Sequence, residues 1–212
     1  MKTITAIFLV LFVTAGFSNL QSQTKLKPSK FSISVQGGGF LPMSDASDIY
    51  NTGGIAGIGL NYKAKKNIEV YLDADYNFIN YKSTGVFDGS PSILDIKAGG
   101  RFFFGNGKYR TFVEGGPGIY MFKTPSLTYT TSQITGIHID PKSHDTTYTY
   151  SDVNTTIPSQ TTTKFGIHAG LGETFNIAKN IDLYLKSDYN IVFTSGSTTM
   201  YFGILAGAKF GF

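Results

Sequence analysis

The chain has 212 residues, of which 15% are charged, whereas an ordinary soluble domain has about 25% charged residues. Its 41% hydrophobic content gives no surplus for a bundle of membrane helices, yet it is too high for a disordered chain. The net charge is +4, and the absence of cysteine excludes disulfide scaffolds, thiol nucleophiles, Cys-ligated metal sites and a lipidated N-terminal cysteine.

The first segment has the organisation of a secretory signal peptide. A short positive start is followed by an apolar run at 4–17 and by a polar stretch of small residues at 18–22. The apolar run is shorter than the ~20 residues of a membrane-spanning helix. We therefore expect a cleaved signal peptide at 1–22 and a polar periplasmic tether at 23–30; the alternative is a buried N-terminal helix.

Alternating hydrophobicity dominates the remainder of the chain. In the last segment every even position from Met200 to Phe212 is apolar, while the odd positions are mostly small or polar. A period of two over this length indicates a strand, because a helix would spread the polar residues around its axis. The pattern predicts eight strands, at about 31–41, 53–63, 67–81, 92–104, 108–123, 163–176, 181–193 and 200–212.

The connections between these strands alternate in length. Tight turns are expected at 64–66, 105–108 and 177–179, and mostly longer loops at 42–52, 82–91, 124–162 and 195–198. Short turns at one end and longer loops at the other are typical of an up-and-down barrel in an outer membrane, and an even strand number places both termini in the periplasm. An internal repeat, in which 67–77 resembles 180–190 and 96–104 resembles 204–212, supports the strand count.

Alternation alone does not distinguish a soluble barrel from a membrane barrel, whose apolar face is turned outward. Strands of about 11–14 residues suit a tilted membrane crossing. The polar face is rich in glycine, as expected inside a narrow barrel, and tyrosines near the strand ends suit interfacial girdles. The sequence thus predicts an all-β fold, an eight-stranded antiparallel transmembrane β-barrel at 31–212. The expected girdle tyrosines are Tyr62, Tyr81, Tyr109 and Tyr189.

Charged residues of the strands fall mainly on the inward face. Eight strands enclose about enough space for packed side chains or one small ligand, so a nearly balanced set of charges predicts a structural network of ion pairs. On this reasoning the net charge of +4 does not indicate an acidic partner. The expected lumen set is Glu69, Asp73, Asp75, Asp95, Lys97, Arg101, Arg110, Glu114, His168, Asp182, Lys186, Asp188 and Lys209.

Tight turns allow inward neighbours to be paired, with small residues opposite large ones. Glu173 falls on the otherwise apolar outward parity, where either an interfacial position or a bulge would accommodate it. The expected opposite pairs are Gly172 with Tyr184, Gly170 with Lys186, His168 with Asp188 and Gly59 with Tyr71; the expected diagonal pairs are Arg101 with Glu114 and Asp182 with Lys209.

Candidate sites for chemistry are few. The glycine clusters at 37–39, 57–59 and 170–172 lie within strand patterns with no helix after them, which argues against a dinucleotide fingerprint. His168 with Asp188 and Glu173 suggests a hydrolase, but no serine has the required spacing. We expect no catalytic residue, metal, cofactor or nucleic-acid partner. Exposed loop polarity explains the four possible metal ligands of the long loop, His138, Asp140, His144 and Asp145.

The leader, the alternating strands, the glycine-rich inner face and the terminal Phe212 resemble the small outer-membrane β-barrel family of Bacteroidetes-type bacteria, similar in plan to the OmpA transmembrane domain and OmpX. The resemblance covers 31–212. It implies a Gram-negative outer membrane, with membrane lipid, lipopolysaccharide and the assembly machinery as partners, and an assembly signal at Phe210 and Phe212. In lipid A deacylases of similar plan a histidine precedes a serine by two residues on a lipid-facing strand, whereas the inward His168 precedes Gly170, so this activity is not carried over.

The long loop is the expected functional element. Thr-Tyr alternation at 146–150 suggests that the adjoining strands continue beyond the membrane, and loops longer than ~12–15 residues are usually functional or disordered. We expect a non-enzymatic barrel that presents loop 124–162 outside the cell for envelope stability, adhesion or recognition, with an extracellular ligand as partner. The alternatives are a small-molecule passage, as in OmpW-type barrels, and a lipid A-modifying enzyme.

Overall fold

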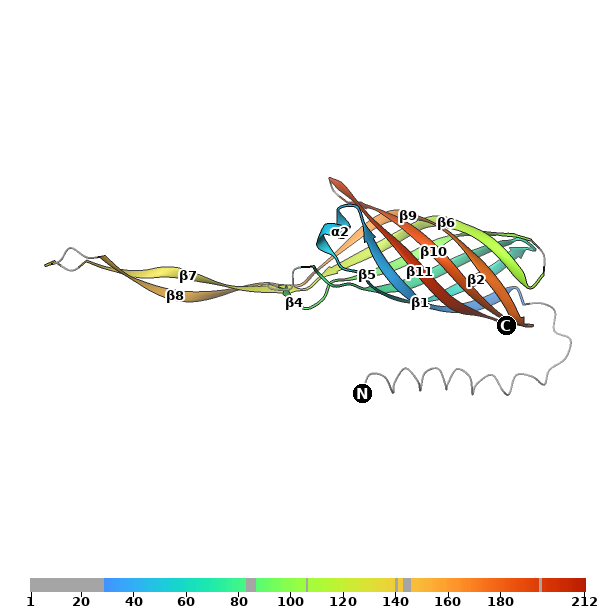
Figure 1. Cartoon of the computed structure of the whole chain (residues 1–212), viewed down its shortest axis with the longest axis horizontal. Helices are drawn as coiled ribbons and strands as arrows, with labels where there is room; N and C mark the ends of the chain where they lie inside the picture. Colours follow the sequence, from blue (N-terminus) through green and yellow to red (C-terminus); the bar gives the residue numbers. More distant parts are fainter. Residues whose placement is uncertain (1–28, 83–86, 106, 140, 143–145, 195) are drawn as a thin grey trace, which may run out of the picture.

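Eight strands of the chain close into an antiparallel barrel in which neighbours around the wall are also consecutive barrel strands along the chain. Figure 1 shows this barrel, with a narrow two-stranded arm extending from one of its ends. The predicted fold class is therefore confirmed. The computed structural model describes residues 29–82, 87–105, 107–139, 141–142, 146–194 and 196–212, so the expected signal peptide and residues 23–28 of the expected tether lie outside the described residues.

The strand bounds agree closely with the sequence pattern, with the largest differences at the loop ends. The barrel strands are β1 (Phe31–Met43), β2 (Gly53–Lys65), β3 (Ile68–Phe78), β5 (Ser92–Phe104), β6 (Tyr109–Thr124), β9 (Gln160–Ala178), β10 (Ile181–Thr194) and β11 (Ser197–Gly211). A four-residue helix, α2 (Ala46–Ile49), follows β1, and within the described residues no helix has the length and apolarity for a membrane crossing.

The outer face of the wall is apolar. Ile58, Leu60, Leu171 and Leu185 are each more than half exposed, while the alternate positions of the same strands are mostly buried. Aromatic pairs occur toward both ends of the wall. They are Phe31–Tyr62, Phe102–Phe104 and Tyr109–Phe175 toward the turn end, and Tyr76–Phe78 and Phe165–Phe193 toward the loop end.

Two of the four expected girdle tyrosines lie differently from Tyr62 and Tyr109, which are exposed on the outer face. Tyr81 stacks on Tyr50, with the ring centroids 5.6 Å apart, at a bridge between two loops. Tyr189 is half-buried, and its hydroxyl donates to the Met200 sulfur. The turn end thus has the clearer aromatic rim.

Strand register differs from the expected pairing by two residues in both halves of the barrel. Gly172 lies opposite Lys186 rather than Tyr184, and Gly59 lies opposite Asp73 rather than Tyr71. Strands β9 and β10 meet at a shorter turn than expected, and each of the two ladders has a bulge beside its turn. A bulge adds one residue to one strand, which a count from the turn does not reveal. The remaining pairs are Gly170 opposite Asp188 and His168 opposite Asn190.

The expected diagonal charge pairs are direct neighbours instead. Arg101 lies opposite Glu114 across β5 and β6, and Asp182 lies opposite Lys209 across β10 and β11. Direct opposition brings the side chains closer than a diagonal arrangement, because Cβ atoms of opposite residues are about 4.5–5.5 Å apart.

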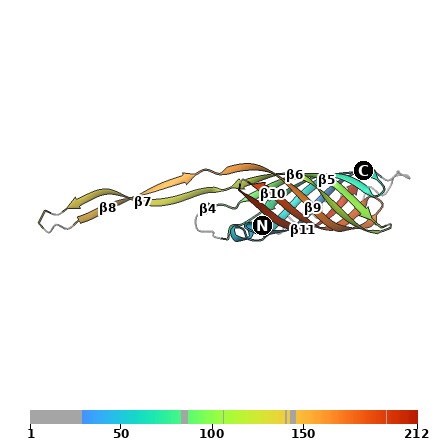
Figure 2. The ribbon, with the colours of Figure 1, turned by 90° about the horizontal axis from the view of Figure 1, so that it is seen from above.

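The expected long loop is a separate β-hairpin. Its strands β7 (Ser126–Ile139) and β8 (Thr146–Ile157) pair with each other, and β7 also pairs with the short β4 (Phe87–Asp88). Figure 2, a view from above, shows the hairpin extending well beyond the barrel. The segment has the expected strand structure, but its strands form a sheet of their own beyond the ends of β6 and β9.

Two prolines separate the hairpin from the barrel wall. The last pair of β6 and β9 is Thr124 with Gln160, and the hairpin resumes in the same register at Leu127 with Ile157. Pro125 and Pro158 lie between these pairs. Proline lacks the backbone N–H of a ladder hydrogen bond, so the sheet is interrupted there without losing its alignment.

Glycines on the inner face make room for large side chains across the wall. Gly99 lies opposite Tyr71, and Gly207 lies opposite Tyr184. A Cβ atom on Gly99 would lie 2.6 Å from the Tyr71 hydroxyl, whereas a Cβ atom on Gly100, which faces outward, would meet nothing within 4 Å. Small residues opposite large ones therefore fill the lumen, as the sequence suggested, although with different partners.

We expect Gly99→Ala to destabilise the barrel by about 1–3 kcal/mol, the usual cost of overpacking. Gly100→Ala, on the adjacent residue of the same strand, should be neutral or slightly stabilising, because alanine restricts the unfolded chain. Denaturant unfolding of both variants in lipid vesicles measures the difference. Equal stability of the two variants would show that the Gly99 position is not crowded.

Candidate functional site

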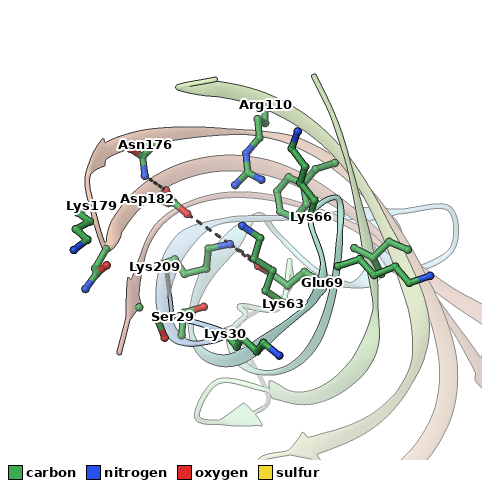
Figure 3. Close-up of a pocket in the computed structure, with 16 residues that line it drawn as sticks. Ser29, Lys30, Lys63, Lys66, Glu69, Arg110, Asn176, Lys179, Asp182 and Lys209 are labelled. Atoms are coloured by element: carbon green, nitrogen blue, oxygen red, sulfur yellow. Dashed lines mark hydrogen bonds and ion pairs between the residues drawn. The ribbon is translucent and has the colours of Figure 1, made fainter. Parts of the chain in front are cut away.

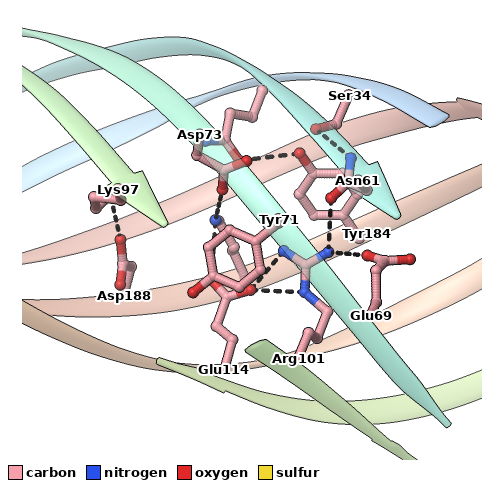
Figure 4. Close-up of polar contacts among 12 residues, drawn as sticks. Ser34, Asn61, Glu69, Tyr71, Asp73, Lys97, Arg101, Glu114, Tyr184 and Asp188 are labelled. Carbon is pink, nitrogen blue, oxygen red and sulfur yellow. Dashed lines mark hydrogen bonds and ion pairs between the residues drawn. The ribbon is translucent and has the colours of Figure 1, made fainter. Parts of the chain in front are cut away.

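Arg101 is the centre of the lower lumen, the half of the barrel interior that is nearer the tight turns; the upper lumen is the half nearer the hairpin. Its guanidinium donates to Glu69 at 2.6 Å and to Glu114 at 2.5 Å, and all three side chains are at most 6% exposed. The guanidinium carbon also lies 4.9 Å from the centroid of the Tyr71 ring and 4.7 Å from that of Phe112. Figure 4 shows Arg101 between its two glutamates. Since β5, β3 and β6 supply these groups, the cluster links three strands through the lumen.

Two lysines extend this cluster. The Lys186 ammonium lies 3.0 Å from Glu114 and 3.2 Å from Asp73, and the Lys209 ammonium lies 2.8 Å from Glu69 and 3.9 Å from Asp182. Each glutamate of the Arg101 cluster therefore has a second cationic partner. Buried charges are tolerated when they are paired and hydrogen-bonded, and the network meets this condition from strands on opposite sides of the barrel.

The upper lumen has Lys97 as its centre. Its ammonium lies 3.0 Å from Asp75 and also contacts Asp188, and both carboxylates are buried. Gln36 donates to Asp75 at 2.5 Å. Asp95, in the same region, accepts a hydrogen bond from Tyr201. Lys97 and its partners therefore connect β5, β3 and β10.

Apolar side chains close the lumen above these charges. Tyr120, Tyr201 and Val192 have no exposed surface, and the other members of the cluster are at most 7% exposed. A buried, mainly hydrophobic layer therefore lies across the lumen at the loop end. The remaining members are Phe40, Ile55, Ile79, Ile93 and Leu205.

His168 belongs to this packed interior. Its Nε2 lies 2.6 Å from the Tyr71 hydroxyl, while the expected partner Asp188 binds Lys97. Glu173 is exposed on the outer face, between Thr111 and Leu185, so the barrel wall separates it from His168. The three residues of the hydrolase alternative therefore do not form a site together.

The predicted lumen residues occupy two kinds of environment. All except Arg110 and Asp182 are buried. Arg110 is half-buried at the turn end, with its guanidinium carbon 4.4 Å from the centroid of the Phe103 ring, and it forms no ion pair within the described part of the chain. Charge parity did not reveal the neutral partners Gln36, Tyr71 and Tyr201, although all three share the inward parity.

Metal-ligand groupings of three or more His, Cys, Asp or Glu side chains are not found in the portion of the chain that the structure describes. His138 lies on β7, opposite Thr147 of β8. The other loop candidates, Asp140, His144 and Asp145, lie outside the described residues.

Comparison with solved structures identifies the fold. The chain resembles Neisserial surface protein A, with a TM-score of 0.60, 15% identity, and coverage of 87% of this chain and 98% of that one. It also resembles Ail, the attachment invasion locus protein of Yersinia pestis, solved with the heparin analogue sucrose octasulfate (TM-score 0.54, 14% identity, coverage 88% and 100%). No protein-family model and no curated protein sequence matches the chain.

These observations define the class of protein. The closed eight-stranded barrel, its apolar outer face and its charged, filled interior are the features of small outer-membrane β-barrels. The chain has the fold of that class, with the β7–β8 hairpin at the loop end of the barrel.

Proposed function

We propose that the protein is a non-enzymatic integral outer-membrane protein that holds the β7–β8 hairpin outside the cell for attachment or recognition. The apolar outer face and the aromatic rim support the membrane location. The ion pairs and apolar layer of the lumen support a rigid anchor rather than a passage. Outer-membrane lipid and lipopolysaccharide surround the wall in this proposal, and Phe210 and Phe212 act in assembly.

The exposed hairpin is the observation that carries the proposal. Every residue of β8 is exposed, although a two-stranded hairpin has little stability by itself in water. Near its tip, one face presents four large side chains that are between 48% and 62% exposed. Exposed apolar and tyrosine side chains in one patch are typical of interaction sites. The patch, called the tip patch below, consists of Ile134, Ile137, Tyr148 and Tyr150.

The composition of the hairpin indicates the chemistry of its partner. Segment 126–157 has three aspartates and one lysine, so a sulfated sugar such as the heparin analogue in the Ail structure would be repelled. The tip patch instead suits an apolar or mixed protein surface. Attachment, the role in the name of Ail, is thus proposed here with a different ligand class.

Protease treatment of intact cells tests the topology. Cleavage within 126–157 should leave a protected barrel fragment, because the wall strands lie in the membrane. The same treatment of cells with a permeabilised outer membrane provides the control for cleavage from the periplasm. Cleavage of the hairpin only after permeabilisation would contradict the proposed orientation.

Two further measurements separate the proposal from its alternatives. The filled lumen should give a protein that is silent in planar bilayers, and solute-sensitive conductance would favour a passage instead. Lipid A should have identical mass spectra in cells with and without the protein. A new deacylated or acylated species would favour an enzyme.

Glu173 provides a test of the membrane-facing surface. It lies one outward position inside Phe175, which belongs to the aromatic rim. Leu60 has the equivalent place in the internal repeat. We expect Glu173→Leu to stabilise the barrel in lipid vesicles by up to about 1 kcal/mol, because a charged side chain on the lipid-facing surface near the interface costs between about 0 and 1 kcal/mol.

Glu69→Leu is the contrasting variant, since it removes a buried partner of Arg101 and Lys209 and should be destabilising. Denaturant unfolding in lipid vesicles measures both changes. A loss of stability in Glu173→Leu as large as in Glu69→Leu would count against a lipid-facing Glu173.

A further inference from the structure

The turn end of the barrel has a charged mouth that the lumen network does not explain. A cavity of about 130 Å³ opens there, in the space between strand ends and turns. Since one water needs about 10–15 Å³ by this measure, the cavity has room for several waters or one small anion. Figure 3 views this mouth, with Arg110 and Lys63 extending toward Lys209, and Lys179 pointing away.

The mouth has a strong excess of positive charge. Seven cationic side chains and only two carboxylates line it. The carboxylates are already engaged, because Glu69 binds Arg101 and Lys209, while Asp182 accepts from Asn176 at 2.8 Å and lies 3.9 Å from Lys209. No ion pair to Lys63, Lys66 or Arg110 forms among the residues that the structure describes.

The fold gathers these cations from separate parts of the sequence. Lys63 is on β2, Lys66 is in the turn that follows, Arg110 is on β6 and Lys209 is on β11. Arg110 is positioned by the Phe103 ring, which leaves its guanidinium half-exposed toward the mouth. Lys63 and Lys66 are not members of the expected lumen set, so the charge pattern along the strands did not reveal this mouth.

The charges that line the mouth favour an anion over a neutral or cationic ligand. The chain segment closest in sequence, 23–28, has two lysines and no carboxylate, so it does not supply the missing negative charge. Arginine offers a planar fork for phosphate oxygens, and lysines add point charges around it. A local excess of several positive charges favours a multivalent anion over a single carboxylate.

We propose that Arg110, Lys63 and Lys66 form a binding site for a phosphate-bearing anion at the turn end of the barrel. Two sources have this chemistry, a free phosphate compound and the headgroup of an anionic phospholipid in the adjoining leaflet. The identity of that leaflet as periplasmic rests on the proposed function, whereas binding at the mouth does not. The site is independent of the hairpin at the opposite end.

Calorimetric titration with pyrophosphate tests the site in the intact protein, reconstituted in phosphatidylcholine nanodiscs. We expect saturable binding at low salt that weakens at high salt, as screening requires. The double variant Arg110→Gln and Lys63→Gln should bind about tenfold more weakly or worse, because charge-assisted hydrogen bonds are lost. Lys82→Gln with Lys123→Gln removes the same charge from exposed lysines at the loop end and should change binding less than about twofold.

A second arm distinguishes the two sources. The protein is placed in nanodiscs that contain equal amounts of phosphatidylglycerol and phosphatidylcholine. Native mass spectrometry then measures which lipid stays bound to the protein after the protein is released from the nanodisc. Selective retention of phosphatidylglycerol, lost in the Arg110 and Lys63 variant, assigns a lipid headgroup; pyrophosphate binding without retention assigns a free phosphate compound.

Absence of both signals, or equal loss in the loop-end control, would overturn the proposal. Heat-modifiable migration in detergent gels verifies that each variant is folded. Neither result depends on which side of the membrane the hairpin occupies, so failure of the anion site and failure of the proposed surface role remain distinguishable.

Discussion

Replacing Arg101 with methionine should destabilise the barrel by about 3–5 kcal/mol, because it leaves buried carboxylates without their main partner. Glu69 and Glu114 both bind this guanidinium, and their side chains are at most 6% exposed. The change also removes the cation between the Tyr71 and Phe112 rings. Lys209 and Lys186 remain as second partners of the two glutamates, which is why we expect a weakened barrel rather than an unfolded one.

Arg110→Met is the matched control for this experiment. Arg110 also lies on the inner face and packs on an aromatic ring, but it is half-exposed and forms no ion pair in the described part of the chain. Its replacement should cost less than about 1 kcal/mol, the range of exposed charges. Denaturant unfolding in lipid vesicles compares the two variants, and equal losses would contradict the importance of the Arg101 network.

Removing the hairpin should abolish attachment without changing the stability of the barrel. We expect a variant in which a short Gly-Ser turn replaces 126–157 to retain the stability of the barrel within about 1 kcal/mol, the usual limit for changes away from a core. The reason is that the β6–β9 ladder is complete at Thr124 and Gln160, before Pro125 and Pro158 interrupt it. Under the proposed function, cells with the intact protein should attach to polystyrene or to neighbouring cells more strongly than cells without it, and cells with this variant should lose that difference.

A second variant keeps the full length of the hairpin and changes only the tip patch. It carries Ile134→Ser, Ile137→Ser, Tyr148→Ser and Tyr150→Ser. It keeps the hairpin and its cross-strand pairs, including Thr130 with Asn154 and Ser132 with Asp152, both with hydrogen bonds of 2.6 Å. If the tip patch makes the contact, this variant should lose attachment as fully as the deletion. Unchanged attachment in both variants would remove the hairpin from the proposed function.

The two ends of the molecule differ in how they meet their surroundings. Ion pairs and an apolar layer fix the barrel interior, so few of its side chains are available for binding. Side chains that are accessible for binding lie at opposite ends of the molecule. Apolar and tyrosine side chains are on the hairpin tip, and cations are in the turn-end mouth. These are the two surfaces at which we propose binding.

Strand existence and facing could be predicted from the sequence because a period of two is a local property. The alternation in 181–193 and 200–212 assigned Lys186, Asp188 and Lys209 to the inner face, where the structure places them. The same pattern located the continuation of the chain into a hairpin. Register could not be obtained in this way, because bulges beside the turns moved Gly172 opposite Lys186 and Gly59 opposite Asp73.

The number of barrel strands, the apolar outer face and the composition of the lumen follow from the sequence alone, since each depends on side-chain alternation along a single strand. The pairs next to tight turns, Arg101 with Glu114 among them, could also be anticipated from the sequence, whereas the contacts across the lumen depend on the tertiary structure. Lys97 meets Asp188, Lys186 meets Asp73, and His168 lies against Tyr71 instead of Asp188, because closure of the barrel brings strands that are not neighbours in the wall across one lumen. The same closure gathered the unpaired cations into one mouth, a concentration of charge that no single strand reveals.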